Sequence, residues 1–437
     1  MYLGRGKDGS LLFTPAESGL LVLGPPRSGK SAAIVVPNVL GATGPVVSTS
    51  TKTDVMEATS GCRARQGDCL LYDPSGSVDA PRGVRRVTWS PVSAASSWDG
   101  ALEVTRALVR SAHGMVGPDS RHWSERAEAL LAPLFHAAWL AGEGPERVSE
   151  WVHRHHVADS QDVLHANGAD FAAGVLDGIA ATDERERSGI FSTAAGVLAA
   201  YRSEGARSSS SDSEVSRFDP AVFVSGGDTL YVCAPATSQS LTAPLVSGLV
   251  DRIRAATYAV HGSGTRTDGK PPARPRPAVL LALDEVANIA PLPDLPAVAS
   301  EGGGQGLVTL ACLQDLSQAR SRWGDQASGF MSLFGAKLFL PGIADVQTLE
   351  AVSTLIGDRQ VALHSRTRGR GRSGWSSSSG STTGFRRRMP PDLLSRGRPG
   401  SALWLQGGEQ PRSVRLTPWY SASPWRELAA AGAPPPS

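Results

Sequence analysis

Residues 20–31 read LLVLGPPRSGKS, and this stretch decides the fold class. It joins an apolar run of strand length to the pattern G-x-x-x-x-G-K-[ST], and the segment that it opens, through VVPNVLGATG, has the character of a helix. In a strand–turn–helix of this kind, backbone N–H groups and the helix N-terminus hold phosphate oxygens. The stretch therefore predicts a nucleotide site built from Gly24, Pro25, Pro26, Arg27, Ser28, Gly29, Lys30 and Ser31.

Individual residues of this loop have expected tasks. Gly24 and Gly29 are expected to allow positive φ angles and a close approach of phosphate to the backbone. Lys30 should reach the β- and γ-phosphates, and the Ser31 hydroxyl should ligate Mg²⁺. The alternative is a glycine-rich turn that contains GKS by chance. Only five of the 43 basic residues are lysines, and this scarcity favours the nucleotide site.

The rest of the chain predicts an α/β fold with an inserted all-α domain. Strand-length apolar runs occur at 45–48 and 69–73, and resume at 229–234, 278–285, 306–314, 336–342 and 401–407. Residues 96–204 show only helical spacing. We therefore expect residues 1–95 and 206–437 to form one α/β domain around an all-α domain at 96–205. Residues 206–214 read as a flexible linker, and residues 262–277 and 364–388 read as loops.

Composition excludes several classes of protein. The 437 residues are 41% hydrophobic and 19% charged, which argues against a disordered chain. A net charge of +2 argues against a wholly basic nucleic-acid coat, although a local basic patch stays open. Four dispersed cysteines predict buried thiols in a reducing compartment and no disulfide scaffold. No apolar run is long enough to span a membrane.

The segment AVLLALDEVANI (278–289) predicts the second half of the site. A continuous apolar strand that ends in Asp284 and Glu285 places two carboxylates at the edge of a parallel sheet where ligands bind. Asp284 is expected to hold Mg²⁺, and Glu285 to orient or deprotonate the attacking water. A helix N-cap pair is the alternative. Gln314 ends the next apolar strand and suits a sensor of the γ-phosphate, with a surface turn as the alternative.

Three weaker signals stay open. His153, His155 and His156 lack a complementary ligand set and fit a solvated helix face better than a metal site. The GGG run at 302–304 fits a flexible loop better than a second phosphate loop. The segment 364–388 holds seven arginines and no acid. It fits either a solvated charge run or, with its interleaved aromatic residues Trp375 and Phe385, contacts to single-stranded nucleic acid.

From about Gly19 to Tyr420 the chain resembles the TraG/TraD type IV coupling proteins. The resemblance rests on GPPRSGKSAAIVVPNVL, the following helical block, and LLALDEVANIAPLPDLPAVASEGGGQGLVTLACLQDLSQARSRWG. That family comprises RecA-like, hexameric ATPases that bring conjugative DNA and protein cargo to a secretion channel. The resemblance implies that Lys30 and Ser31 form the Walker A pair, that Asp284 and Glu285 form the Walker B pair, and that Gln314 is the sensor.

The sequence departs from the family pattern in two places. Residues 50–54 read Ser-Thr-Lys-Thr-Asp where many members carry Asp-Pro-Lys-Gly-Glu, so one carboxylate is missing. The usual N-terminal pair of transmembrane segments is absent, through truncation or because it was never encoded. The arginine that a neighbouring subunit would supply is unassigned among Arg320, Arg322 and Lys337.

These observations predict an ATP- and Mg²⁺-dependent RecA-like motor of a conjugative or type IV secretion system. The resemblance implies DNA, single-stranded by preference, a relaxase or other protein cargo, and secretion-channel components as partners. It also implies a homo-hexamer when active, with a monomer in isolation left open, located in the cytoplasm at the inner face of the cell membrane. The alternatives are a DNA translocase of the FtsK/HerA type and a nucleotide-gated adaptor that hardly hydrolyses ATP. The inserted helical block disfavours the translocase.

Overall fold

The computed structural model describes residues 1–437 except 114–117, 212–215, 236, 263–276, 372–373 and 432–437. The described residues form a sheet of twelve strands in the order β2-β1-β14-β13-β10-β3-β9-β8-β4-β7-β5-β6. Neighbours from β10 to β6 are parallel, and the pairs at the β13 end are antiparallel. The strands are β1 (Tyr2–Arg5), β2 (Leu11–Phe13), β3 (Leu20–Leu23), β4 (Val46–Ser50), β5 (Cys69–Tyr72), β6 (Val84–Arg86), β7 (Thr229–Cys233), β8 (Val279–Leu283), β9 (Leu307–Leu313), β10 (Ala336–Phe339), β13 (Ser401–Gln406) and β14 (Arg412–Arg415).

The parallel strands are apolar because helices cover both faces of the sheet. Alternate residues of β3 enter two different cores: Leu20 and Val22 join one, and Leu21 and Leu23 join the other. One face carries a π-helical turn, Ser31–Val35, together with α1 (Val36–Gly41), α2 (Asp54–Arg63) and α19 (Trp425–Ala431). The other face carries α12 (Gln239–Gly262), α13 (Val286–Ile289), α14 (Leu295–Glu301), α15 (Leu316–Trp323), α16 (Phe330–Leu333) and α17 (Val346–Ile356).

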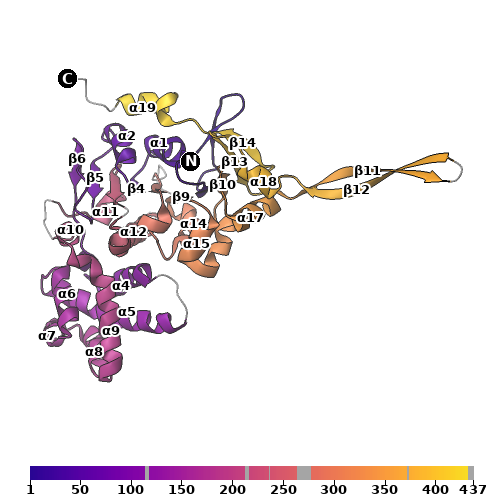
Figure 1. The fold of residues 1–437 in the computed structure, drawn as a ribbon. Helices are drawn as coiled ribbons and strands as arrows, with labels where there is room; N and C mark the ends of the chain where they lie inside the picture. The colour runs from indigo at the N-terminus through magenta and orange to yellow at the C-terminus, as the bar shows by residue number, and fades with distance from the viewer. Residues whose placement is uncertain (114–117, 212–215, 236, 263–276, 372–373, 432–437) are drawn as a thin grey trace, which may run out of the picture.

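A helical block stands beside one end of this body, between β6 and β7 in the chain (Figure 1). Its central helix, α5, buries an apolar stripe that includes Leu130, Leu134 and Phe135. The block comprises α4 (Trp98–His113), α5 (Pro118–Leu140), α6 (Pro145–Arg154), α7 (Ala158–Ala166), α8 (Asp170–Ala180), α9 (Glu184–Val197) and α10 (Glu204–Ser209), after a short α3 (Pro91–Ala94) and before α11 (Pro220–Phe223). The domain boundaries at residues 95 and 205 stay predictions.

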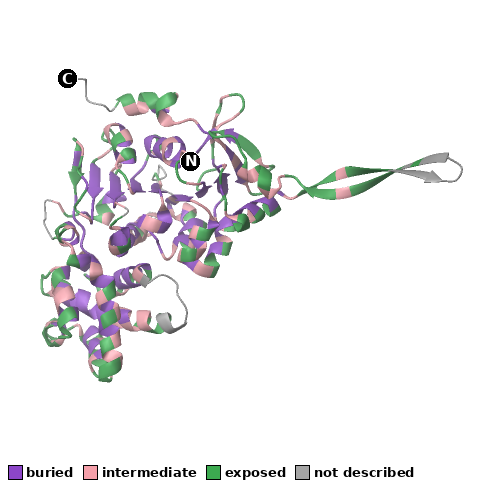
Figure 2. Ribbon diagram, viewed as in Figure 1, coloured by how far each residue is buried: buried purple, intermediate pink, exposed green. Residues whose placement is uncertain are grey.

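Residues 358–371 and 374–387 form a second, two-stranded sheet that extends far from the body (Figure 1). Strands β11 (Asp358–Gly371) and β12 (Gly374–Arg387) pair antiparallel along their whole length. We call them the ribbon. Its described side chains are almost all exposed (Figure 2). The prediction of a loop at 364–388 is therefore wrong, because inter-strand hydrogen bonds hold this polar segment in register without a core.

A second loop prediction is also wrong. Residues 204–209 form α10 with Ala206 and Ser209 buried, so the expected linker at 206–214 begins as packed helix. The GGG run lies in the short connection between α14 and β9, which contains a 3₁₀ turn. A Cβ atom at Gly303 would clash with the Glu17 carbonyl group, whereas Gly304 is exposed. The predicted loop at 262–277 lies almost entirely outside the described residues.

Two predictions about the chain as a whole can be compared with the structure. All four cysteines are free and buried, as expected. Within the part of the chain that the structure describes, no helix has both the length and the apolar character needed to cross a bilayer.

Candidate nucleotide site

The candidate site lies at the edge where the parallel strands end. Leu23 of β3 pairs with Leu313 of β9, and Leu283 of β8 pairs with Ala311 of the same strand. The loops after β3, β9 and β8 therefore emerge side by side. This register brings the predicted phosphate loop, the Asp-Glu pair and Gln314 to one place.

The phosphate loop is closed by its own lysine. The Lys30 ammonium group donates hydrogen bonds to the carbonyl oxygens of Gly24, at 2.5 Å, and Pro25, at 3.0 Å, and the residue is only 9% exposed. Arg27 and Gly29 adopt positive φ angles of 60° and 92°. The expectation for Gly29 is thus confirmed.

The expectation of a positive φ at Gly24 is wrong. Gly24 has no such angle, but a Cβ atom there would lie 2.8 Å from the Cβ atom of Leu340, which follows β10. Its backbone N–H donates to the Leu313 carbonyl group at 3.1 Å. Glycine is needed at this position because the loop packs closely between two strands.

The two residues predicted to hold Mg²⁺ are in contact. The Ser31 hydroxyl donates to the Asp284 carboxylate at 2.5 Å, although 253 residues separate them in the chain. Asp284 is 5% exposed, and this burial raises the pKa of its carboxyl group to about 6, against the opposing effects of the Ser31 hydrogen bond and the Lys30 charge. A hydroxyl and a carboxylate oxygen are the hard ligands that Mg²⁺ prefers, so the pair fits this ion.

Glu285 sits in a strained backbone conformation directly after Asp284. Its φ and ψ angles are 52° and 46°, a left-handed conformation that costs free energy in a residue other than glycine. It stands at the N-terminus of α13, but its side chain caps no N–H group there. The alternative of a helix N-cap pair is therefore not supported at Glu285, which is half-buried at the same edge.

Gln314 follows β9 and lies between the phosphate loop and the Asp-Glu pair. It is half-buried, and its backbone N–H donates to Gln318 Oε1 at 3.0 Å. The Gln318 amide also lies 3.5 Å from Asn288 Oδ1 of α13. Gln318 and Asn288 thus link the two strand ends, a role that the sequence did not reveal because each residue reads as an ordinary helix position.

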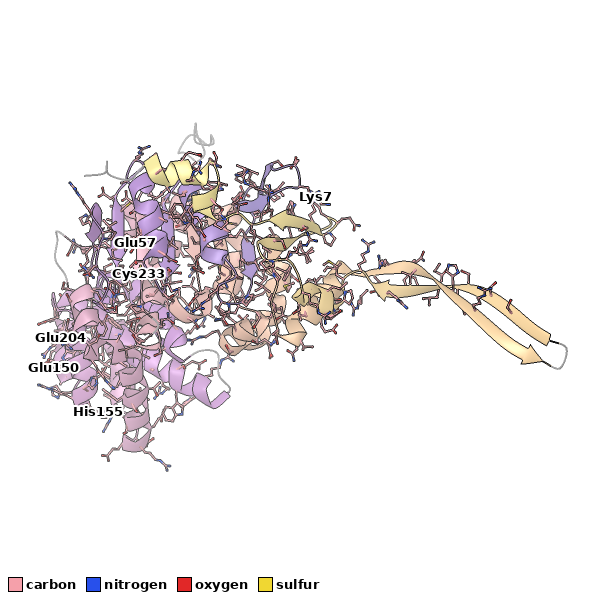
Figure 3. All side chains as sticks on the ribbon, turned by 45° about the horizontal axis from the view of Figure 1, so that its top comes forward. Lys7, Glu57, Glu150, His155, Glu204 and Cys233 are labelled. Carbon is pink, nitrogen blue, oxygen red and sulfur yellow. The ribbon has the colours of Figure 1, made fainter. Side chains whose placement is uncertain are left out.

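The charge of Asp54 also affects the candidate site. Asp54 begins α2 after β4, and its charge contributes to the raised pKa of Asp284. On the same side of the sheet, the Lys52 carbonyl group contacts the Cys233 thiol, and Figure 3 labels Cys233 near Glu57 of α2. The Ser-Thr-Lys-Thr-Asp run therefore borders the site with one carboxylate close enough to affect it.

Several other candidates do not converge on the site. Arg320 pairs with Asp345 at 3.0 Å, Arg322 donates to the Ala287 carbonyl group at 2.8 Å, and Lys337 lies within β10 nearer its amino end. Among the histidines, His155 stacks on Phe191 at 4.6 Å in the helical block (Figure 3). No group of three or more His, Cys, Asp or Glu residues suited to a metal occurs among the described residues.

Comparisons with known proteins support the resemblance. Residues 278–397 match the family described as "TraM recognition site of TraD and TraG". Two Escherichia coli proteins, each named "Conjugal transfer protein TraG", are 25% and 24% identical over 393 and 391 residues, which is 83% of this chain. The chain spans 59% of the length of these relatives.

Solved structures show the same fold. The bacterial conjugative coupling protein TrwBdeltaN70 superposes with a TM-score of 0.67 at 18% identity, over 95% of this chain and 88% of that one. The plasmid coupling protein TrwB in complex with ADP and Mg²⁺ gives the same TM-score of 0.67 at 19% identity and the same coverage. The predicted likeness to TraG/TraD coupling proteins is therefore confirmed. So is the fold class, a RecA-like α/β fold with an inserted helical block.

Proposed function

From this likeness to the TraG/TraD coupling proteins, we propose that the chain is an ATP-hydrolysing motor of a conjugative or type IV secretion system. It would bring DNA and attached protein cargo to the secretion channel and power their transfer. The observation that carries the proposal is the 2.5 Å contact between Ser31 and Asp284 beside the buried Lys30 ammonium group. A P-loop serine beside the carboxylate of a neighbouring strand is the pair that holds Mg²⁺ in P-loop NTPases.

Each residue at the sheet edge would have a distinct task with ATP bound. Lys30 would exchange its two carbonyl partners for phosphate oxygens, which are charged and therefore better acceptors. Ser31 and Asp284 would hold Mg²⁺, which neutralises phosphate charge. The TrwB complex with ADP and Mg²⁺ supports this pairing of nucleotide and metal in the same fold.

Glu285 and Gln314 would act on the attacking water. Glu285 would orient it or accept its proton, and the uncapped side chain described above leaves the carboxylate available for this. Gln314 lies between the phosphate loop and Glu285 and would sense the γ-phosphate. The arginine expected from a neighbouring subunit stays unassigned.

The proposed partners follow from the family resemblance. We expect a homo-hexamer at the inner face of the cell membrane, with DNA, a relaxase or other cargo, and channel components as partners. The match of residues 278–397 to a TraM recognition family supports a protein partner for this segment of the chain. The helical block contains none of the proposed catalytic residues, and its surface carries mixed charges that suit an exchangeable protein contact, so we expect it to recognise cargo.

The rate of ATP hydrolysis with and without DNA tests the proposal. We expect turnover that DNA stimulates and that Lys30→Ala abolishes. ATP binding without hydrolysis in the presence of DNA would favour the adaptor instead. Exchanging the helical block for that of a related coupling protein should change which cargo binds while ATP turnover stays within a few-fold.

A further inference from the structure

A polar cavity lies at the amino edge of the parallel strands, opposite the nucleotide site. It holds about 420 Å³ and is bounded by β10, the last turn of α17, the base of the ribbon and the turn between β13 and β14. Lys337 pairs with Leu21, which lies near the amino end of β3, whereas the phosphate loop follows the carboxyl end of that strand. The lining residues are Lys337, 355–358, Arg388 and 405–411.

Lys337 lines this cavity, and none of the described residues bonds its ammonium group. The residue is 9% exposed, and among the described residues no hydrogen bond or ion pair reaches its side chain. Burial lowers the pKa of Lys337, and no neighbouring carboxylate opposes that shift. A lysine that is nine-tenths buried and has no partner for its charge is costly, and a bound anion relieves the cost.

The acids around the cavity already have cationic partners of their own. Asp358 lies 3.8 Å from Arg387, and Glu409 lies 3.0 Å from Arg412. Among the residues that the structure describes, the Arg388 side chain donates only to neutral acceptors, the Asp358 carbonyl group at 3.2 Å and the Gln410 amide oxygen. Lys337 and Arg388 therefore remain as the two uncompensated positive charges that line the cavity. No donor in the described part of the chain reaches the buried Gln406 Oε1, which can accept from a water that enters with the ligand.

The sequence of the ribbon is rich in positive charge up to the point where the ribbon meets this cavity. Residues 359–391 contain eight arginines and no Asp or Glu, whereas the whole chain has a net charge of only +2. Arg359 and Arg386 are directly opposite one another across the ribbon, and both are exposed. Facing like charges destabilise a strand pair, and a polyanion removes the repulsion. The Arg388 N–H bonds the Gly357 carbonyl group at 3.0 Å and so fixes the ribbon base beside Lys337.

We propose that this cavity binds a phosphate group through Lys337 and Arg388, and that the phosphate belongs to a nucleic-acid backbone that follows the ribbon. Exposed arginines track phosphates without reading sequence. A single nine-tenths buried lysine at the end of such a track supplies a fixed contact. The nucleic-acid part rests on the proposed function, in which DNA is the cargo, whereas the phosphate part does not.

The test compares Lys337→Met with Lys7→Met as the matched control. Lys7 is an exposed lysine between β1 and β2 (Figure 3). Binding of a fluorescent single-stranded oligodeoxynucleotide is measured over a salt series with saturating Mg-ADP. We expect Lys337→Met to weaken binding about tenfold and to reduce the slope of log affinity against log salt by about one, with Lys7→Met unchanged. Equal affinity and slope in both variants would overturn the nucleic-acid contact.

Two further measurements keep the phosphate part falsifiable. Thermal stabilisation by inorganic pyrophosphate, again with Mg-ADP present, should be lost in Lys337→Met and reduced in Arg388→Gln, whose exposed side chain can change without disturbing the core. If Lys337→Met lost the stabilisation by pyrophosphate but bound DNA as the wild type does, the cavity would be a site for a small phosphate compound. That result would overturn the proposed contact to a nucleic-acid backbone. If pyrophosphate stabilised Lys337→Met as much as the wild type, the proposal that this cavity binds an anion would be overturned. If the wild type bound no DNA, the DNA role in the proposed function would fail, and the pyrophosphate result would still decide about the cavity.

Discussion

Lys30 follows the loop after β3, and Lys337 lies in the neighbouring strand β10. The two lysines are equally buried, yet they differ in their partners. Each is 9% exposed. The Lys30 ammonium group is held by two loop carbonyl groups, whereas no described residue bonds that of Lys337. Burial alone therefore does not show what a buried cation does. Lys30 bonds to its own loop, where we propose that phosphate would replace the carbonyl groups. Lys337 lines a cavity in which none of the described residues accepts a hydrogen bond from it.

Arg63 gives the largest contrast with Lys337. It is fully buried at the end of α2, and its guanidinium group donates to Thr229, Gln66 and the carbonyl groups of Ala42, Gly44 and Gly227. Arg63→Met should lower the free energy of unfolding by about 3–5 kcal/mol, because it leaves these buried acceptors without a donor. Urea unfolding measures this. A loss below about 1 kcal/mol would show that water can replace the guanidinium group.

Asp284 extends the comparison to a buried anion. Its folded-state pKa of about 6 exceeds the usual 3.8, so protonation favours the folded state. The cost of burying the charge is absent below about pH 3.8 and complete above about pH 6. Asp284→Asn should therefore raise the free energy of unfolding at pH 7.5, without Mg²⁺, by on the order of 2–3 kcal/mol, and have little effect near pH 4.

The control for this variant is Asp392→Asn, at an exposed position in α18 (Pro391–Ser395). It should leave unfolding unchanged at both pH values. Added Mg-ATP should then stabilise the wild type more than Asp284→Asn, because the metal needs the charged carboxylate. A stability gain in Asp284→Asn that is the same at pH 4 and pH 7.5 would contradict the raised pKa.

Lys30→Ala tests the lysine of the phosphate loop. ATP binding should weaken by about ten- to a hundredfold, because the phosphates lose a buried charge-assisted hydrogen bond. Isothermal titration calorimetry measures this affinity, and Lys7→Ala is the matched control with no expected effect. Unchanged affinity in Lys30→Ala would remove the phosphate role of this lysine.

The smallest expected effect concerns the stability of Lys337→Met. Replacing an unpartnered buried ammonium group by an apolar side chain of similar length should change the free energy of unfolding by less than about 1 kcal/mol, or raise it. The same urea unfolding as for Arg63→Met gives a direct comparison. A loss of more than about 2 kcal/mol would show that Lys337 has a structural partner, and would weaken its assignment to a ligand.

The residues of the candidate nucleotide site were predictable because the sequence patterns that mark them are local. A continuous apolar strand followed by GPPRSGKS or by Asp-Glu is contained within a dozen residues, and parallel pairing then places such strand ends together. The reason for Gly24 could not be predicted, because it depends on Leu340 in a distant strand. The contributions of Gln318 and Asn288 also require the packing of α13 against α15.

The ribbon and its cavity show where sequence patterns fail. Residues 376–383 read SSSSGSTT, which has no apolar alternation, so nothing in this run marks a strand. The short strands β1, β2 and β14, at the antiparallel end of the sheet, were missed because none of them contains four consecutive apolar residues. The Lys337 cavity is assembled from four separate segments, and no single segment carries a recognisable motif.

The separation of ATP binding from ATP turnover in Glu285→Gln tests the central claim most directly. Calorimetry should give an affinity for Mg-ATP within a few-fold of the wild type, and turnover should fall at least about a hundredfold, the scale of a lost general base. Glu350→Gln, at an exposed position on α17, should leave both quantities unchanged. Wild-type turnover in Glu285→Gln would contradict the assignment of this sheet edge as the site of hydrolysis.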